Sequence, residues 1–356
     1  MKDHLPPITF VNPNQPARQG IPIHVLTYGH DNYIRVTVEN SIGHWPGDSS
    51  ANSDGGRQSP DPTLLPMDRY GSPTRWIDIG AAGPRDVKFT AQTDVNWLKV
   101  SPSHGKITRD AKNDERLRLS VDWSKVHADS TGKLHIVCAD GSNVTITVPV
   151  LSPEGPPEDY HGFVQGDGYV VMEAAHFARN TSSDGYAFEE ILGYGRTLSG
   201  LEMFPMTTQN FTLGQGPSLS YDFWTHTSGP IEINVQIGPT LNFFGIEKPL
   251  SFGLQLDDQS PVEYQPIPVE PLGSVPDRPG GKSTVAIGAV PKDWINIVKS
   301  EIRNVTLSAE IKAPGHHTLT IWGMTTGLIF ERIWVDLGGI SKRGYSYLGP
   351  PESMVV

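Results

Sequence analysis

Apolar and polar residues alternate in short runs along much of this chain. Six such runs lie between about residues 69 and 150, and WIDI at 76–79 and VTITV at 144–148 are the clearest. A period of two places every second side chain on one face of a strand, as in the half-buried strands of a β-sandwich. Because turns of Gly, Pro, Asp and Asn separate the runs, the pattern predicts a small β-sandwich in residues 67–153.

A second and larger group of strand-like runs follows a Pro/Gly-rich boundary near residue 155. These runs predict a larger β-sandwich in residues 160–350, with one short helix within PKDWINIVKSEIRN at 291–304. Residues 1–66 are expected to form a junction segment that contains a short hairpin and a disordered loop. The fold class is therefore all-β: two consecutive sandwiches, the small one first, with one short helix.

The composition supports this fold class and excludes some partners. Gly (37) and Pro (31) interrupt regular elements and favour many short strands. A net charge of −11 argues against a nucleic-acid partner, because phosphate binding needs clustered Lys and Arg. No apolar window reaches 18 residues, so no transmembrane helix is expected.

The sequence shows no catalytic constellation. It lacks the G-x-S-x-G elbow, the H-E-x-x-H motif and any cysteine pair at zinc spacing. The paired carboxylates at 189–190 and 257–258 are neighbours on strands, where side chains point to opposite faces, so solvated charges are the better interpretation. The single cysteine, Cys138, is predicted to be a small buried hydrophobic residue.

Aromatic residues mixed with polar ones stand in loops and at strand ends of the larger sandwich. Sugars bind to proteins through aromatic faces packed on C–H patches, while nearby polar groups take the hydroxyls. Core packing is the competing interpretation for each of these aromatic side chains. The candidate carbohydrate-binding residues are Tyr194, Arg196, Trp224, Asn242, Phe243 and Phe244.

Many ordered motifs of this chain resemble the back half of glycoside hydrolase family 115. The likeness runs through TRWIDIG, NWLKVSPSHGKI, RLRLSVDWSKV, GFVQGDGYVVMEAAHFARN, LGYGRTLSGLEMFP, SLSYDFW, IGPTLNFFG, APGHHTLTIW, WVDLGG and SYLGPPES. Upstream, IRVTVENSIGHWPGD resembles the stretch that follows the family's helical region. The resemblance covers most of the chain, from about residue 1 to Ser353.

Members of that family are xylan α-1,2-glucuronidases, which remove glucuronic acid or its 4-O-methyl ether with inversion. Their catalytic carboxyl groups lie on a (β/α)-barrel that precedes the part seen here, and this chain lacks the strand–helix alternation of such a barrel. The resemblance implies an accessory region that is inactive alone and supports substrate binding, domain packing or dimerisation. Its implied partners are the missing barrel of the same polypeptide, glucuronoxylan and, in a homodimer, a second copy. Arg196 would pair with a uronate carboxylate, and an internal ion pair is the alternative for it.

Two other functions stay open at this point. One is a stand-alone lectin-like module that binds uronate-bearing xylan, and the other is a pure assembly domain whose apolar surface docks on the barrel. The start of the chain shows no signal peptide, although the full-length enzyme is expected to be secreted. The sequons at Asn143, Asn180, Asn210 and Asn304 matter only in a secretory pathway.

The last domain also resembles, more weakly, the jelly-roll-like sandwiches of carbohydrate-binding module families 6 and 35. There, an E-A-E first strand and an I-D last strand supply carboxylates to a structural calcium ion. Glu173 and Asp336 match those positions, whereas Ala175 replaces the second glutamate. Because calcium prefers six to eight oxygen ligands, this replacement weakens the implied calcium site. No cofactor is otherwise required, and the small sandwich is expected to act as a spacer.

Overall fold

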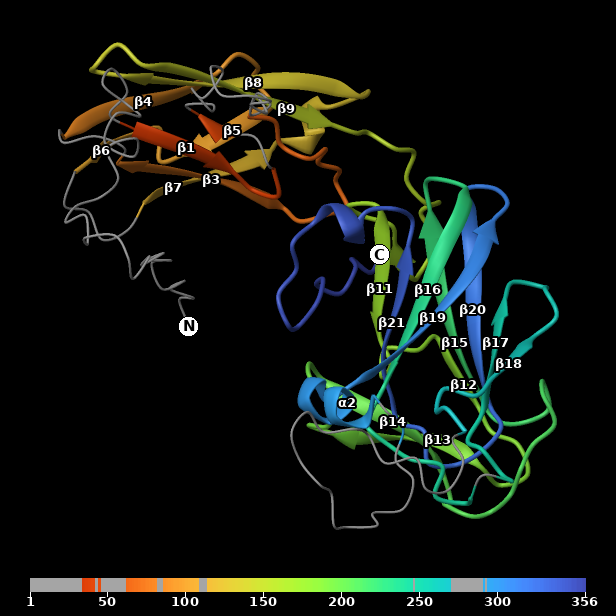
Figure 1. Ribbon diagram of the computed structural model, residues 1–356. Coiled ribbons are helices and arrows are strands. Elements are labelled where there is room, and N and C mark those ends of the chain that lie inside the picture. Colours follow the sequence, from red (N-terminus) through yellow and green to blue (C-terminus); the bar gives the residue numbers. More distant parts are fainter. Residues whose placement is uncertain are drawn as a thin grey trace, which may run out of the picture. The chain divides into compact units, whose positions relative to one another are not determined.

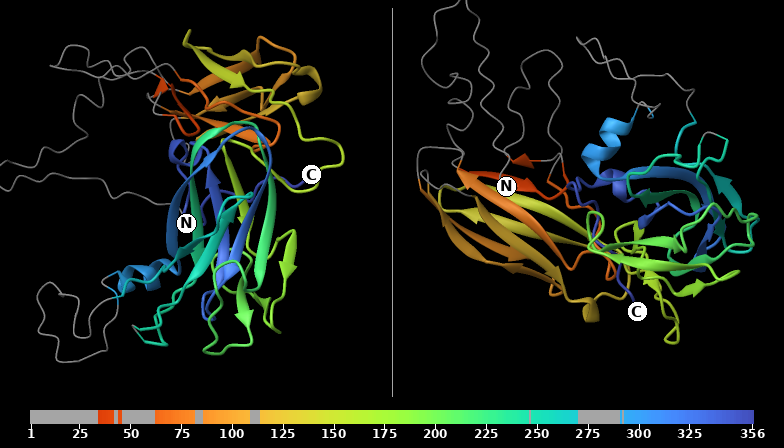
Figure 2. Two further views of the ribbon diagram at one scale, coloured as in Figure 1. Left: turned by 90° about the vertical axis from the view of Figure 1, so that its right-hand side faces the viewer. Right: turned by 90° about the horizontal axis from the view of Figure 1, so that it is seen from below.

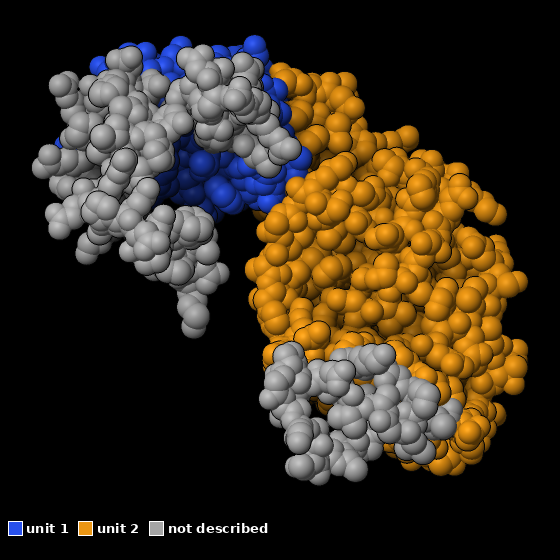
Figure 3. Space-filling view, viewed as in Figure 1, with its two compact units in different colours: residues 1–65, 74–122, 132–148 blue, residues 66–73, 123–131, 149–356 orange. Residues whose placement is uncertain are grey.

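A computed structural model describes residues 34–41, 44–45, 62–81, 86–108, 114–245, 247–269, 291 and 293–356. Their regular secondary structure is nearly all β-strand, with a single short α-helix, so the predicted all-β fold class is confirmed (Figure 1). The chain divides into two compact units, coloured separately in Figure 3. The first unit takes residues 1–65, 74–122 and 132–148, and the second takes residues 66–73, 123–131 and 149–356.

The first unit contains a five-stranded sheet with the order β2-β1-β3-β7-β5 and a four-stranded sheet with the order β6-β4-β8-β9. Its strands are β1 (Ile34–Val38), β2 (His44–Trp45), β3 (Thr74–Ala81), β4 (Val87–Thr93), β5 (Leu98–Ser101), β6 (His104–Ile107), β7 (Glu115–Val121), β8 (Ser130–Cys138) and β9 (Asn143–Val150). A short 3₁₀-helix, η1 (Trp123–Lys125), lies between β7 and β8.

Alternating side chains form the core of the first unit. Ile77 and Leu117 of one sheet and Leu134 and Ile146 of the other are fully buried. Cys138 is buried among them as expected, and burial raises the pKa of its thiol to about 11.

The first unit differs from the expected N-terminal junction at β1. This strand pairs with β3 along its whole length, from Ile34 opposite Ala81 to Val38 opposite Ile77. The apolar side chains at positions 34, 36 and 38 are buried, which is the physical reason that the segment joins the sheet. The partner strand of the predicted hairpin, at 23–29, and most of the predicted loop at 41–66 lie outside the described residues. Two described parts of that loop belong to the fold instead: His44–Trp45 forms β2, which pairs with β1, and Leu64 is buried.

The second unit contains two six-stranded sheets. The sheet named here the β15 sheet has the order β10-β15-β20-β17-β18, with β12 paired to β15, and the β21 sheet has the order β13-β14-β21-β16-β19, with β11 paired to β21. The strands are β10 (Phe163–Val164), β11 (Tyr169–Glu173), β12 (Arg179–Thr181), β13 (Ala187–Leu192), β14 (Ser199–Phe204), β15 (Ser218–Thr225), β16 (Gly229–Ile237), β17 (Phe252–Leu256), β18 (Val262–Tyr264), β19 (Arg303–Ile311), β20 (Gly315–Gly323) and β21 (Phe330–Asp336).

Both sheets contribute one face to a continuous core. Tyr221 and Phe223 of β15 are fully buried, as are Ile333 and Val335 of β21. Because successive side chains of a strand point to opposite faces, the residues between them lie on the outer faces of the sheets. The outer face of the β15 sheet therefore carries Asp222 and Trp224.

Helix α2 (Trp294–Ser300) lies within the predicted segment and ends at Glu301, whose backbone is left-handed. None of its residues is buried. Both views of Figure 2 show α2 protruding from the strands of the second unit. A second 3₁₀-helix, η2 (Ile340–Lys342), follows β21. No helix in the described part of the chain is long and apolar enough to cross a membrane.

Candidate functional site

Arg196 lies in the loop between β13 and β14 and ties three segments of the second unit together. Its Nε donates a hydrogen bond of 2.7 Å to the backbone oxygen of Ser300, and its Nη1 donates one of 2.8 Å to the backbone oxygen of Tyr347. The guanidinium carbon lies 3.8 Å from the centre of the Tyr347 ring, a cation–π contact. The group expected to meet a uronate thus binds carbonyl oxygens of its own chain.

A buried carboxyl group lies directly below this loop. Glu331 is 2% exposed, its Oε2 accepts a 3.2 Å hydrogen bond from the backbone N–H of Arg196, and its Oε1 has no hydrogen-bond partner. Burial raises the pKa of Glu331 to about 7, although Arg196 acts in the opposite direction. Position 195 must be glycine here, because a Cβ would collide with the Glu331 carboxyl and the backbone φ is +82°.

Tyr194 and Asn242 hold loops at the same end of the β21 sheet. The Tyr194 ring packs on the backbone at positions 200 and 238, where only glycine leaves room, and burial raises the pKa of its hydroxyl. Asn242 accepts a 2.9 Å hydrogen bond from the N–H of Leu250 and donates one of 3.3 Å to the oxygen of Ile267. Both side chains therefore stabilise the loops in which they lie.

Phe243 and Phe244 pack on each other, with ring centres 4.4 Å apart. Phe244 also packs against the core of the second unit, whereas Phe243 is 51% exposed. Of these two predicted ligand platforms, Phe243 alone offers a largely open ring.

The structure separates Trp224 from the other predicted residues. Tyr194, Arg196 and Phe243 lie in loops beside the β20–β21 connection, which follows Gly323 at the end of β20. Trp224 instead pairs with His316 at the start of β20, at the other end of the second unit. The six predicted residues therefore do not form one site.

Around Trp224 the structure brings together polar side chains that sequence reasoning did not select. Arg179 of β12 binds Asp222 of β15 through two hydrogen bonds of 2.7 and 3.0 Å. The hydroxyl of Thr318, on β20, donates a 2.7 Å hydrogen bond to the same carboxylate, and Nε2 of His316 lies 3.5 Å from it. Burial alone would raise the pKa of Asp222, but the bonds from Arg179 and Thr318 outweigh burial and hold that pKa below its ordinary value.

An aromatic group adjoins this cluster. The Tyr160 ring packs edge-on against Trp224, with centres 5.7 Å apart, and against the His316 ring, with centres 5.6 Å apart. Further along the same face, the hydroxyls of Ser220 and Thr320 lie 3.1 Å apart. We call Arg179, Asp222, Trp224, His316 and Thr318, together with Tyr160, the Asp222 cluster.

The residues predicted to hold calcium lie far apart. Glu173 stands opposite Arg332 in the β11–β21 pair, whereas Asp336 stands opposite Tyr169, four positions along. At about 3.4 Å per residue this places the two positions roughly 14 Å apart. One calcium ion therefore does not fit between these two carboxylates.

Each of the two carboxylates also has partners in the chain. Arg332 Nε lies 2.9 Å from Glu173 Oε1, and Thr197 donates a 2.7 Å hydrogen bond to Glu173 Oε2. Asp336 Oδ1 accepts hydrogen bonds from the backbone N–H groups of residues 338, 339 and 340. Among the described residues, no group of three His, Cys, Asp or Glu side chains gathers to hold a metal ion.

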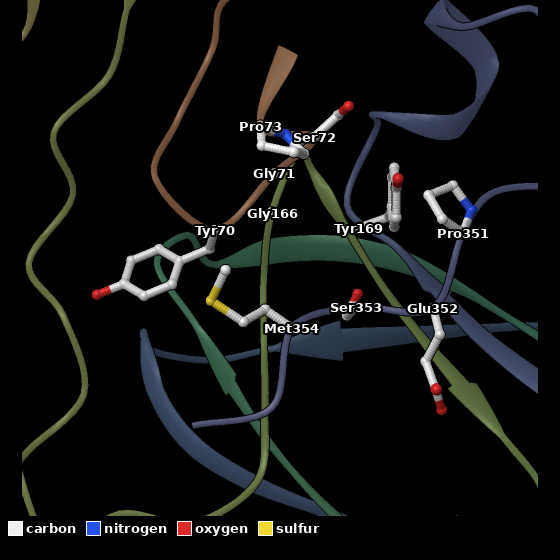
Figure 4. A pocket seen from close by; sticks show the side chains of 10 residues that line it. All are labelled: Tyr70, Gly71, Ser72, Pro73, Gly166, Tyr169, Pro351, Glu352, Ser353 and Met354. Carbon is white, nitrogen blue, oxygen red and sulfur yellow. The ribbon is translucent and has the colours of Figure 1, made fainter. Parts of the chain in front are cut away.

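A hollow of about 360 Å³ lies elsewhere in the second unit (Figure 4). Its volume suits a small ligand, but its walls are mostly apolar. The Glu352 carboxylate at its rim is already a partner of the His176 ring, 2.8 Å away, and of the backbone N–H of Glu173. The lining residues are Tyr70, Gly71, Ser72, Pro73, Gly166, Tyr169, Pro351, Glu352, Ser353 and Met354.

The strands and sheets of both compact units define an all-β protein of the β-sandwich class. The family model described as glycosyl hydrolase family 115 C-terminal domain matches residues 162–352, more than half of the chain. The chain therefore belongs to this family, as the sequence motifs indicated.

Three solved structures illustrate what the chain is similar to. A family 115 4-O-methyl-α-glucuronidase with specificity for decorated arabinogalactans shares 14% identity over 52% of this chain and 19% of its own, with a TM-score of 0.32. A family 35 carbohydrate-binding module from Clostridium thermocellum shares 10% identity over 47% of this chain and 97% of its own, with a TM-score of 0.28. A carbohydrate-binding module of Cellvibrio mixtus lichenase 5A, in complex with cellotriose, shares 15% identity over 47% and 95%, with a TM-score of 0.24. A comparison with curated proteins gives no match.

Proposed function

We propose that this chain is the non-catalytic C-terminal accessory region of a xylan α-1,2-(4-O-methyl)glucuronidase. The observation that carries this proposal is the family match over residues 162–352. An inverting glycosidase needs a carboxylic acid and a carboxylate about 6.5–9.5 Å apart, on opposite sides of the scissile bond. In this proposal both groups belong to a catalytic barrel of the same polypeptide, and the chain itself hydrolyses nothing.

The loops near Arg196 support a role in domain packing. Their side chains are fixed by contacts within the chain, so they form a rigid surface. Apolar side chains of the same segments are exposed: Leu192 is 81% exposed, Tyr347 52% and Val298 47%. Exposed apolar groups around a rigid centre are typical of an interface, here with the catalytic barrel or with a second copy in a homodimer.

The test uses the full-length enzyme with and without residues 160–350. We expect the shortened enzyme to lose kcat/KM on polymeric glucuronoxylan, either through a higher KM or through loss of a stable catalytic part. The melting transition of the catalytic part separates these two causes. Unchanged kcat/KM on the polymer would contradict an accessory role in substrate binding or packing.

A stand-alone lectin-like function has one observation in its favour, the Asp222 cluster on an outer sheet face. That surface offers an aromatic group, Trp224, and a guanidinium group, Arg179, whose side chain is 53% exposed.

A further inference from the structure

We propose that the Asp222 cluster is a glycan-binding surface that holds a uronate-bearing xylan chain, with the ring on Trp224 and the uronate carboxylate beside Arg179. This proposal rests on the proposed function, from which it takes the glycan class, and it names the surface that meets the substrate.

The aromatic side chains of the Asp222 cluster lie on the outer face of the β15 sheet. Trp224 lies on the outer face of the β15 sheet, because its neighbours Phe223 and Thr225 are fully buried on the inner side. Its ring is held by the edge of Tyr160, which also contacts the ring of His316. An aromatic face that is only partly covered and cannot rotate freely suits the C–H patch of a pyranose ring.

The exposed charge of this surface is positive. The Arg179 side chain is 53% exposed, and two of its five N–H groups bind Asp222. The other three N–H groups are not used in this ion pair. The His316 side chain is 52% exposed, whereas that of Asp222 is 13% exposed and bound on both oxygens. The accessible groups are therefore the guanidinium cation of Arg179 and the imidazole ring of His316, and a guanidinium complements a uronate carboxylate.

The side chains of the Asp222 cluster are held in place by one another before any ligand arrives. Arg179, Asp222 and Thr318 come from three adjacent strands, and their mutual hydrogen bonds fix the guanidinium plane. Little side-chain entropy is then lost on binding. The half-buried Thr320 and Trp322 continue this face along β20, and from His316 to Trp322, six positions away, the face spans about 20 Å. That length is enough for several sugar residues.

The experiment measures the affinity of the purified chain for three probes by titration calorimetry. They are a xylo-oligosaccharide that carries one 4-O-methylglucuronate, the same compound with its carboxyl group reduced to an alcohol, and the unsubstituted xylo-oligosaccharide. We expect the first probe to bind tightest. Trp224→Ala should weaken all three probes about tenfold or more, whereas Arg179→Ala should weaken the first probe about tenfold and the other two little.

Two further variants keep the result interpretable. Arg179→Lys retains a positive charge beside Asp222 but lacks the planar fork, so we expect a several-fold loss for the first probe in a protein that is still folded. Phe243→Ala removes an exposed ring at the other end of the unit and should leave all affinities unchanged. The melting temperature of each variant shows whether it is folded.

The possible results separate the proposals. Equal probe affinities of wild type, Trp224→Ala and Arg179→Lys would show that the Asp222 cluster does not bind the glycan. A loss of affinity in Phe243→Ala alone would place the glycan-binding site at the opposite end of the unit. No affinity for any probe would overturn glycan binding while leaving the packing role, which the shortened full-length enzyme tests independently.

Discussion

Glu331 makes the stability of the second unit depend on pH in a specific way. Burial raises the pKa of its carboxyl group from 4.5 in a solvated chain to about 7 in the folded protein. The folded state therefore favours the protonated form, and the stability linked to Glu331 is fully present below about pH 4.5 and is lost as the pH rises through about 7.

The size of this effect follows from the shift. One pKa unit corresponds to about 1.4 kcal/mol, so the shift of Glu331 amounts to at most about 3 kcal/mol of unfolding free energy between those pH values. Glu331→Gln keeps the shape and an oxygen that accepts the N–H of Arg196, but it cannot ionise. We expect the variant to gain up to that amount relative to wild type as the pH is raised from about 4 to about 8.

The assay is urea unfolding of wild type and Glu331→Gln at several pH values in this range, followed by tryptophan fluorescence. Other titrating groups are present in both proteins and cancel in the difference between the two curves. Glu189→Gln, at an exposed position of β13, makes the same chemical change and controls for the loss of one negative charge. If the difference between wild type and Glu331→Gln stays constant with pH, the carboxyl group is not held protonated by burial and the reasoning fails.

Three other predictions concern residues with an assigned place in the structure. Arg196→Ala should lower the unfolding free energy by about 2 kcal/mol, because the carbonyl oxygens at positions 300 and 347 lose a charged donor. It should also speed hydrogen exchange in α2. Unchanged stability and exchange would show that Arg196 does not hold these segments together. Cys138 should react with a thiol reagent at about pH 8 only after denaturation, because burial raises its pKa to about 11; rapid reaction of the native protein would show that the thiol is accessible. A chelator should leave the melting temperature unchanged, because Glu173 and Asp336 are too far apart to share a calcium ion; a fall reversed by added calcium would reveal a site.

The alternating runs predicted much of the fold because a strand of a sandwich buries every second side chain. β3, β8 and β9 lie where WIDI, LHIVC and VTITV alternate most regularly. β12 carries no such signal, because its three residues, Arg179–Thr181, are all exposed. β14 carries none either, because all but the last of its residues are buried. Such strands are specified by their neighbours rather than by their own sequence.

The candidate site was less predictable because its partners are distant in the sequence. Trp224 was selected for its type, but Arg179 and Thr318 reach Asp222 only through the pairing of β12 and β20 with β15. Arg196 shows the opposite case. The sequence predicts a carboxylate partner for its guanidinium, yet the fold supplies backbone oxygens of α2 and of the C-terminal segment. No spacing of residues along the sequence indicates such partners.

The most direct test of the account is an assay of glucuronate release from glucuronoxylan by the purified chain, beside the full-length enzyme at the same molar concentration. We predict release by the full-length enzyme and none above background by the chain alone. Release by the chain, which a substitution within it abolishes, would contradict its assignment as a non-catalytic accessory region.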